Sequence, residues 1–83
     1  MEQLDLTIDI HLEEDETDTV VRATLNLQGD EFEASGRAHR RTHDRPIPVI
    51  GEELAVARAL GDLTNQVTAA AQAKIEAFLT PSH

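Results

Sequence analysis

Residues 44–63 read DRPIPVIGEELAVARALGDL, and across this stretch the chain changes from an alternating pattern to the pattern of a long helix. Pro46 and Pro48 favour extended backbone, because each proline disfavours helix at the residue before it. Glu52 and Glu53 come next, and the helix dipole favours acidic residues at a helix N-terminus. The sequence therefore predicts that the strands end before this stretch and that a helix begins within it.

The predicted helix covers residues 51–79, where no proline occurs and alanine is frequent. At 100° per residue its apolar positions form one broad stripe, made of Leu54, Ala57, Leu60, Leu63, Val67, Ala71, Ile75 and Phe78. The opposite side carries Arg58, Asp62, Asn65, Gln66, Gln72 and Glu76. We expect the stripe to face the core, with Leu60 and Leu63 as its anchors. Such a helix spans about 42 Å against about 33 Å for a ten-residue strand, so it either overhangs its sheet or bends at Gly61 and Asp62.

Three segments before the helix alternate between apolar and polar residues, as half-buried strands do. They cover residues 3–13, 18–28 and 31–42. An acidic run joins the first two, and Gly29 between the second and third supplies the positive φ of a tight hairpin turn. The inward positions of the third segment include Gly36, so a helix has room to approach closely there.

Three consecutive strands with short links predict an antiparallel meander with one apolar face, which the helix must cover. The predicted fold class is α+β, with two layers in the order β-β-β-α: a three-stranded antiparallel meander packed on one long C-terminal helix. The 83 residues make a single domain, residues 1–83, in which about fifteen large apolar side chains would be buried.

The composition excludes several classes of protein. The chain has no cysteine, so it has neither a disulfide framework nor a thiolate zinc site. It shows no signal-peptide pattern and no apolar run of membrane-spanning length, so we expect a cytoplasmic protein without membrane contact. The formal net charge of −9 opposes non-specific binding to nucleic acid, and no DNA partner is expected.

One basic stretch interrupts this acidic chain. Residues 1–33 carry a net charge of −10, whereas residues 34–45 carry +3. In one interpretation the basic stretch meets phosphate or an acidic protein surface, and its candidate binding residues are Arg22, Arg37, His39, Arg40, Arg41 and Arg45. In the other interpretation the arginines balance acids such as Asp5, Asp9 and Glu33 across the outer face of the sheet.

Catalytic chemistry has little support in the sequence. Neither Ser35 nor Ser82 has a basic residue at a spacing that indicates a nucleophile–base pair, and no glycine-rich phosphate loop occurs. His39 and His43 are four residues apart, a spacing that aligns metal ligands on a helix but not on a strand. Without Tyr or Trp, the chain also lacks aromatic side chains for stacking on nucleic acid. We therefore expect no enzyme activity, no metal and no cofactor.

The stretch at residues 44–63 also closely resembles the hallmark of a small actinobacterial family of unknown function, whose members are similar in fold to the double-stranded-RNA-binding domain. The resemblance covers nearly the whole chain and implies the same β-β-β-α fold. It further implies a role in stress or dormancy physiology and a likeness to ribosome-hibernation factors. RNA contacts do not carry over at the start of the last helix, because Gly51, Glu52 and Glu53 stand where the RNA-binding domain has lysines.

Two functional hypotheses follow. The first is a non-catalytic protein-interaction module that forms a homodimer, since a meander has two unpaired edges and the long helix exceeds its sheet. The alternative is an RNA- or ribosome-binding regulator that uses residues 37–45. Because four arginines must overcome sixteen acids, we expect no measurable binding to generic double-stranded RNA at physiological salt.

Overall fold

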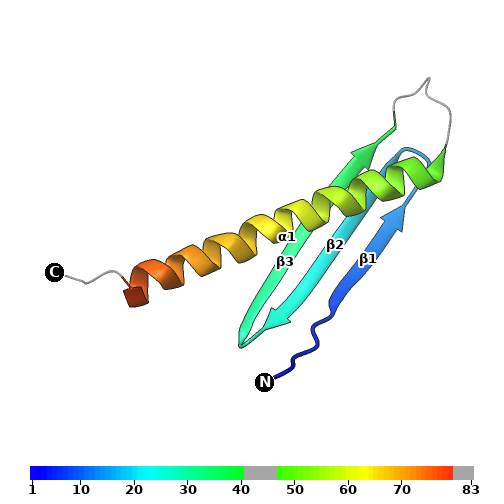
Figure 1. The fold of residues 1–83 in the computed structure, drawn as a ribbon. Coiled ribbons are helices and arrows are strands. Elements are labelled where there is room, and N and C mark those ends of the chain that lie inside the picture. Colours follow the sequence, from blue (N-terminus) through cyan, green and yellow to red (C-terminus); the bar gives the residue numbers. More distant parts are fainter. Residues whose placement is uncertain (41–46, 80–83) are drawn as a thin grey trace.

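The computed structural model describes residues 1–40 and 47–79. It contains three strands, β1 (Ile8–Glu14), β2 (Asp18–Leu27) and β3 (Asp30–His39), and the helix α1 (Pro48–Leu79). The strands form one antiparallel sheet in the order β1-β2-β3, and α1 lies across one face of it (Figure 1). The predicted α+β fold, a three-stranded meander packed on a long C-terminal helix, is confirmed.

The strands differ from their predicted bounds mainly at the ends. β1 begins at Ile8, five residues later than predicted, and the register that pairs Ile8 with Leu25 places residues 3–5 opposite the turn between β2 and β3. In that turn Gln28 and Gly29 both have positive φ, 49° and 88°, so the predicted hairpin is confirmed. β3 ends at His39, and residues 41 and 42 of the predicted third strand lie outside the described residues.

The helix begins three residues earlier than predicted, at Pro48. A proline is tolerated in the first turn of a helix, because the backbone N–H groups there have no acceptor within the helix. The first turn consequently contains no acidic residue, and Glu52 and Glu53 lie one turn further on. The predicted stabilisation of these two acids by the helix dipole is wrong, since that effect falls off within the first turn.

The core lies between α1 and two of the three strands. Its buried residues are Val21, Ala23, Leu25, Phe32, Ala34, Ala38, Ala55, Ala59 and Leu63. Leu63 is 3% exposed, which confirms it as a core anchor, whereas Leu60 is 36% exposed and its predicted role as an anchor is wrong. The helix therefore presents Ala55 and Ala59 to the sheet, and Leu54 and Ala57 of the predicted stripe are exposed.

Close approach at Gly36 explains why alanines face the sheet. A Cβ atom on Gly36 would lie 2.3 Å from the carbonyl oxygen of Ala55 and 2.4 Å from the backbone nitrogen of Ala59. The backbone of α1 therefore rests directly on β3, as the small inward residues of this strand predicted. Larger side chains at positions 55 and 59 would hold the helix away, so the apolar stripe is rotated from the one that periodicity alone indicates.

The helix covers β2 and β3 and leaves β1 uncovered. A helix is about 10 Å wide and neighbouring strands are about 4.8 Å apart, so one helix covers roughly two strands. All seven residues of β1 are exposed, although Ile10 pairs with the buried Ala23 and so points to the same side as α1. The expectation of about fifteen large buried side chains is wrong, and the described residues contain four: Val21, Leu25, Phe32 and Leu63.

The C-terminal part of α1 projects beyond the sheet. The helix has 32 residues, or about 48 Å, and residues 71–79 are all exposed. It continues through Gly61 and Asp62, so of the two alternatives the overhang is the one observed. Figure 1 shows this end, coloured orange to red, extending past β3.

Polar residues of α1 hold the free edge of β3. Arg58 Nη1 donates to the carbonyl oxygen of Arg37 at 2.7 Å, and Gln66 Nε2 donates to that of Glu33 at 2.8 Å. Between them, Asp62 Oδ2 accepts from the backbone N–H of Ser35 at 3.3 Å. These side chains were predicted to face solvent. They instead satisfy the outward backbone groups of an edge strand, which would otherwise be open to pairing with another chain.

Candidate functional site

Three of the candidate basic residues lie on the outer face of the sheet, the face without a helix. Arg22, Arg37 and His39 are exposed and alternate with residues buried under α1. Arg40 follows the end of β3. Arg41 and Arg45, together with His43, lie outside the described residues.

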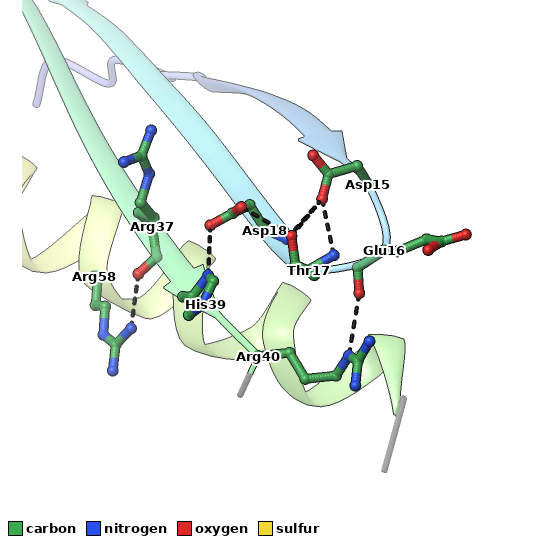
Figure 2. Close-up of polar contacts among 8 residues, drawn as sticks. All are labelled: Asp15, Glu16, Thr17, Asp18, Arg37, His39, Arg40 and Arg58. Carbon is green, nitrogen blue, oxygen red and sulfur yellow. Dashed lines mark hydrogen bonds and ion pairs between the residues drawn. The ribbon is translucent and has the colours of Figure 1, made fainter. Parts of the chain in front are cut away.

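His39 and Arg40 hold the β1–β2 link against the end of β3 (Figure 2). His39 Nδ1 lies 2.9 Å from Asp18 Oδ1. Arg40 Nε donates to the carbonyl oxygen of Glu16 at 3.1 Å, and its backbone N–H donates to that of Thr17 at 2.7 Å. Both side chains are therefore used in contacts within the chain.

The acids of this link are stabilised in their ionised form. The backbone N–H groups of Thr17 and Asp18 both donate to Asp15 Oδ1 at 2.8 Å, and these bonds lower the pKa of Asp15. The hydrogen bond with His39, followed by that from Thr17, lowers the pKa of Asp18. The predicted acidic turn is thus a hydrogen-bonded structure that joins two strands.

Arg22 and Arg37 lie on neighbouring strands, with Arg22 opposite Ser35 and Val20 opposite Arg37. Arg22 Nη1 lies 4.0 Å from Glu33 Oε1, with both side chains more than half exposed. An exposed pair at this distance contributes little stability, about 0–1 kcal/mol. Among the ion pairs of the described residues, Arg22 is balanced by Glu33, and neither Asp5 nor Asp9 takes that role.

Acidic side chains interrupt the basic residues on the outer face of the sheet. Exposed acids that alternate in the same phase are Asp9 and Glu13 of β1 and Glu31 and Glu33 of β3. A surface of mixed sign attracts phosphate weakly, because the attraction of each cation is offset by a nearby carboxylate. The geometry therefore favours the interpretation that these residues contact acids within the chain for Arg22 and His39, whereas Arg40 contacts backbone carbonyl oxygens.

Two acids, Glu14 and Glu52, lie beside each other near the start of α1, a contact that the sequence did not indicate. The neighbouring carboxylate of Glu14 raises the pKa of Glu52, first through a shared hydrogen bond and then through like-charge repulsion. Glu14 Oε2 also accepts from the hydroxyl of the buried Thr19 at 2.9 Å. Within residues 1–40 and 47–79, no group of three or more His, Asp or Glu side chains is placed to hold a metal ion.

A recess of about 760 Å³ lies beside this pair, between the start of α1 and the ends of β1 and β3. Its lining includes Glu14, Thr19, His39, Gly51 and Leu54. A Cβ atom on Gly51 would lie 3.1 Å from Thr19 Oγ1, so this glycine brings the first turns of the helix close to β2. The recess contains carboxylates, an imidazole and the hydroxyls of Thr17 and Thr19, and the Thr19 hydroxyl is buried and donates to Glu14.

A further feature of the described residues is an exposed apolar surface on β1. Four side chains on the helix side of β1 and the residues before it form what we call the β1 apolar face. They are Leu6 (49% exposed), Ile8 (43%), Ile10 (46%) and Leu12 (37%). The alternation in the sequence placed these residues on the inward side correctly. What it did not indicate is that α1 would leave them uncovered, although a single helix facing three strands was the available signal.

Comparison with known proteins places the chain in a family. Residues 4–83 match the family described as Rv2632c-like. The chain belongs to the Rv2632c-like family. Uncharacterized protein Rv2632c of Mycobacterium tuberculosis (strain ATCC 25618 / H37Rv) is 41% identical to it over 70 residues, which are 84% of this chain and 75% of that protein. Uncharacterized protein Mb1767 of Mycobacterium bovis (strain ATCC BAA-935 / AF2122/97) is 39% identical over 71 residues, which are 86% and 76% of the two chains.

A solved structure has the same fold. The crystal structure of Rv2632c superposes with a TM-score of 0.90 and covers 99% of this chain and 98% of the other. Identity over this longer alignment is 35%. The predicted membership in an actinobacterial family of unknown function is confirmed, and these mycobacterial relatives are themselves uncharacterised. Within residues 1–40 and 47–79, no helix has the length and apolar character needed to cross a membrane.

Proposed function

We propose that this chain is a non-catalytic protein-interaction module and that the β1 apolar face is its binding surface. The observation that carries the proposal is the exposure of Leu6, Ile8, Ile10 and Leu12, which lie together on one side of one strand. Contiguous apolar patches of several hundred Å² are rare on monomers and mark interaction sites. Covering a half-exposed leucine or isoleucine contributes about 1 kcal/mol, so this face offers about 4 kcal/mol to a partner.

The polar groups of the described residues support a non-catalytic role. Those with a shifted pKa are Asp15, Asp18 and Glu52, and all three are on the surface. Hydrogen bonds within the turn lower the pKa of Asp15 and of Asp18, and the neighbouring Glu14 carboxylate raises the pKa of Glu52. The backbone N–H of Ser35 donates to Asp62. Among the hydrogen bonds of the described residues, none joins the Ser35 hydroxyl to a histidine that could act as its base.

The RNA- or ribosome-binding alternative stays a prediction. His39 and Arg40 contact the β1–β2 link, and the outer face of the sheet alternates in sign, so fewer cations are available for phosphate than the sequence indicated. The role in stress or dormancy physiology also stays a prediction. Comparing the abundance of the protein in growing and starved cells of its native host tests that role.

The proposed function is tested by capture from cytosol at low and moderate salt. The baits are the immobilised wild-type chain, Ile10→Glu, and His11→Glu as the matched control, which adds the same charge on the opposite face of the same strand. We expect a protein partner that the wild type and His11→Glu retain and that Ile10→Glu loses. If RNA is retained instead, is lost with Arg40→Glu plus Arg41→Glu, and is unaffected by Ile10→Glu, the proposal is wrong and the alternative takes its place.

A further inference from the structure

The side of α1 that points away from the sheet carries no charged residue from Leu54 to Leu79. Measured around the helix axis at 100° per residue, this side includes Ala57, Gly61, Thr64, Thr68, Ile75 and Leu79, all of them exposed. We call it the uncharged side of α1. Charged residues make up 28% of the chain and are usual on the solvent side of a helix, so their absence here needs an explanation.

The two threonines on this side form hydrogen bonds with the helix itself. The hydroxyl of Thr64 donates to the carbonyl oxygen of Leu60 at 2.9 Å, and that of Thr68 donates to Thr64 at 2.8 Å. With their hydroxyls bonded to the helix backbone, these threonines can be covered without losing a hydrogen bond to water. A Cβ atom on Gly61 would have nothing within 4 Å, so another chain can approach the helix backbone closely at this position.

The chain therefore has an apolar strand face that its own helix leaves uncovered and an uncharged helix side that contacts no strand. We propose that a second copy of this chain covers the β1 apolar face with the uncharged side of its α1, and that the contact is reciprocal. This inference rests on the proposed function and names the partner. A reciprocal contact closes with twofold symmetry, and the two helices then lie between the two sheets.

The available area and the charge both favour a second copy. At roughly 200 Å² for a fully exposed large side chain, the β1 apolar face with Leu4 exposes about 470 Å², and Ile75 and Leu79 of the uncharged side of α1 add about 250 Å². Their sum is close to the roughly 800 Å² that each partner contributes to a stable interface. Neither surface is charged, so two copies with a net charge of −9 each can meet here without placing like charges in contact.

Sedimentation equilibrium tests the association with matched pairs of variants. We expect the wild type at tens of micromolar to have twice the chain mass of 9.1 kDa. Ile10→Glu on the strand and Thr68→Glu on the helix should each weaken association at least about a hundredfold, because each buries an unpaired charge. The controls are His11→Glu and Ala69→Glu, which change the residues that follow Ile10 and Thr68 and lie outside the proposed contact. Both control chains should dimerise as the wild type does. Far-UV circular dichroism establishes that each variant is folded.

Cysteine cross-linking tests the arrangement, and the chain has no cysteine of its own to interfere. Chains carrying Ile10→Cys are mixed with chains carrying Thr68→Cys and oxidised in air. We expect a disulfide between the two kinds of chain and none when His11→Cys replaces Ile10→Cys. A disulfide between two Ile10→Cys chains without any link to Thr68→Cys would show pairing of β1 with β1, and would overturn the proposed arrangement.

The results separate this inference from the proposed function on which it rests. A wild-type chain that remains a 9.1 kDa species at tens of micromolar overturns the second copy as the partner. If Ile10→Glu still loses a different captured protein, the proposed function stands and only its partner changes. If Ile10→Glu alters neither association nor capture, both proposals fail.

Discussion

Replacing Gly36 with alanine tests whether the backbone of α1 rests on β3. The added Cβ would lie 2.3 Å from the carbonyl oxygen of Ala55, 2.4 Å from the backbone nitrogen of Ala59 and 2.9 Å from the carbonyl carbon of Arg58. All three atoms belong to the helix backbone and cannot rotate away. An ordinary contact needs about 3.4 Å, so α1 must move by about 1 Å, and both the packing of Leu63 and the bond from Arg58 to β3 are disturbed.

We expect Gly36→Ala to cost about 3 kcal/mol, the upper part of the range for overpacked cores. For a domain of this size that corresponds to a fall in Tm of roughly 12–24 °C. The matched control is Gly61→Ala, where a Cβ meets nothing within 4 Å. Because alanine is the better helix former, the control should stabilise the chain by about 0.5–1 kcal/mol.

Thermal and urea unfolding followed by far-UV circular dichroism measure both variants, since the chain has no Trp or Tyr for fluorescence. The close approach would be refuted by a Gly36→Ala variant whose Tm stays within about 3 °C of the wild type. A variant that fails to fold while Gly61→Ala folds normally agrees with the expectation.

Three further expectations concern single side chains. Leu63→Ala should cost about 2–5 kcal/mol in urea unfolding and Leu60→Ala about 1 kcal/mol, because Leu63 is buried and Leu60 is 36% exposed; equal losses would contradict the observed rotation of the helix. Glu14 raises the pKa of Glu52, so this pair destabilises the fold as pH rises through the ordinary value of 4.5; Glu52→Gln should therefore raise Tm at pH 7 and have little effect well below pH 4.5, and an equal effect at both pH values would disagree. Gln66→Ala removes the bond to the carbonyl oxygen of Glu33 and should cost about 0.5–1.5 kcal/mol, which a denaturant midpoint unchanged from the wild type would disprove.

The order of the elements was predictable because the strands repeat every two residues in hydrophobicity and the helix repeats every 3.6 residues. Alternation located the strands, and Gly29 located the hairpin turn, since glycine adopts positive φ without a steric penalty. The small residue at Gly36 correctly indicated close approach of the helix. The helix start was placed too late because Pro48 was given the extended conformation, although proline also suits the first turn of a helix.

The face of the helix could not be predicted from hydrophobicity alone. The large residues form a stripe in the sequence, but the distance between helix and sheet at Gly36 selects Ala55 and Ala59 for the contact. Arg58 and Gln66 looked like solvent-facing residues because nothing in a single segment shows that an edge strand lies beside them. For the candidate site, the sequence placed Arg22, Arg37 and His39 on one face and named Glu33 as an acid that balances them, but it did not indicate the contact between His39 and Asp18.

The four-residue spacing of Arg58, Asp62 and Gln66 has a consequence for how the gene can vary in length. These residues bind every second residue of β3, so strand and helix are held in step over two turns. Inserting one codon after Gly61 would turn Asp62 and Gln66 by about 100° away from the strand and break the contacts together. The same insertion after Glu76 would only lengthen a part of the helix that touches no strand. Changes in length are therefore compatible with the fold near the end of α1. They are incompatible with it between Arg58 and Gln66, where the helix bonds to the edge of β3.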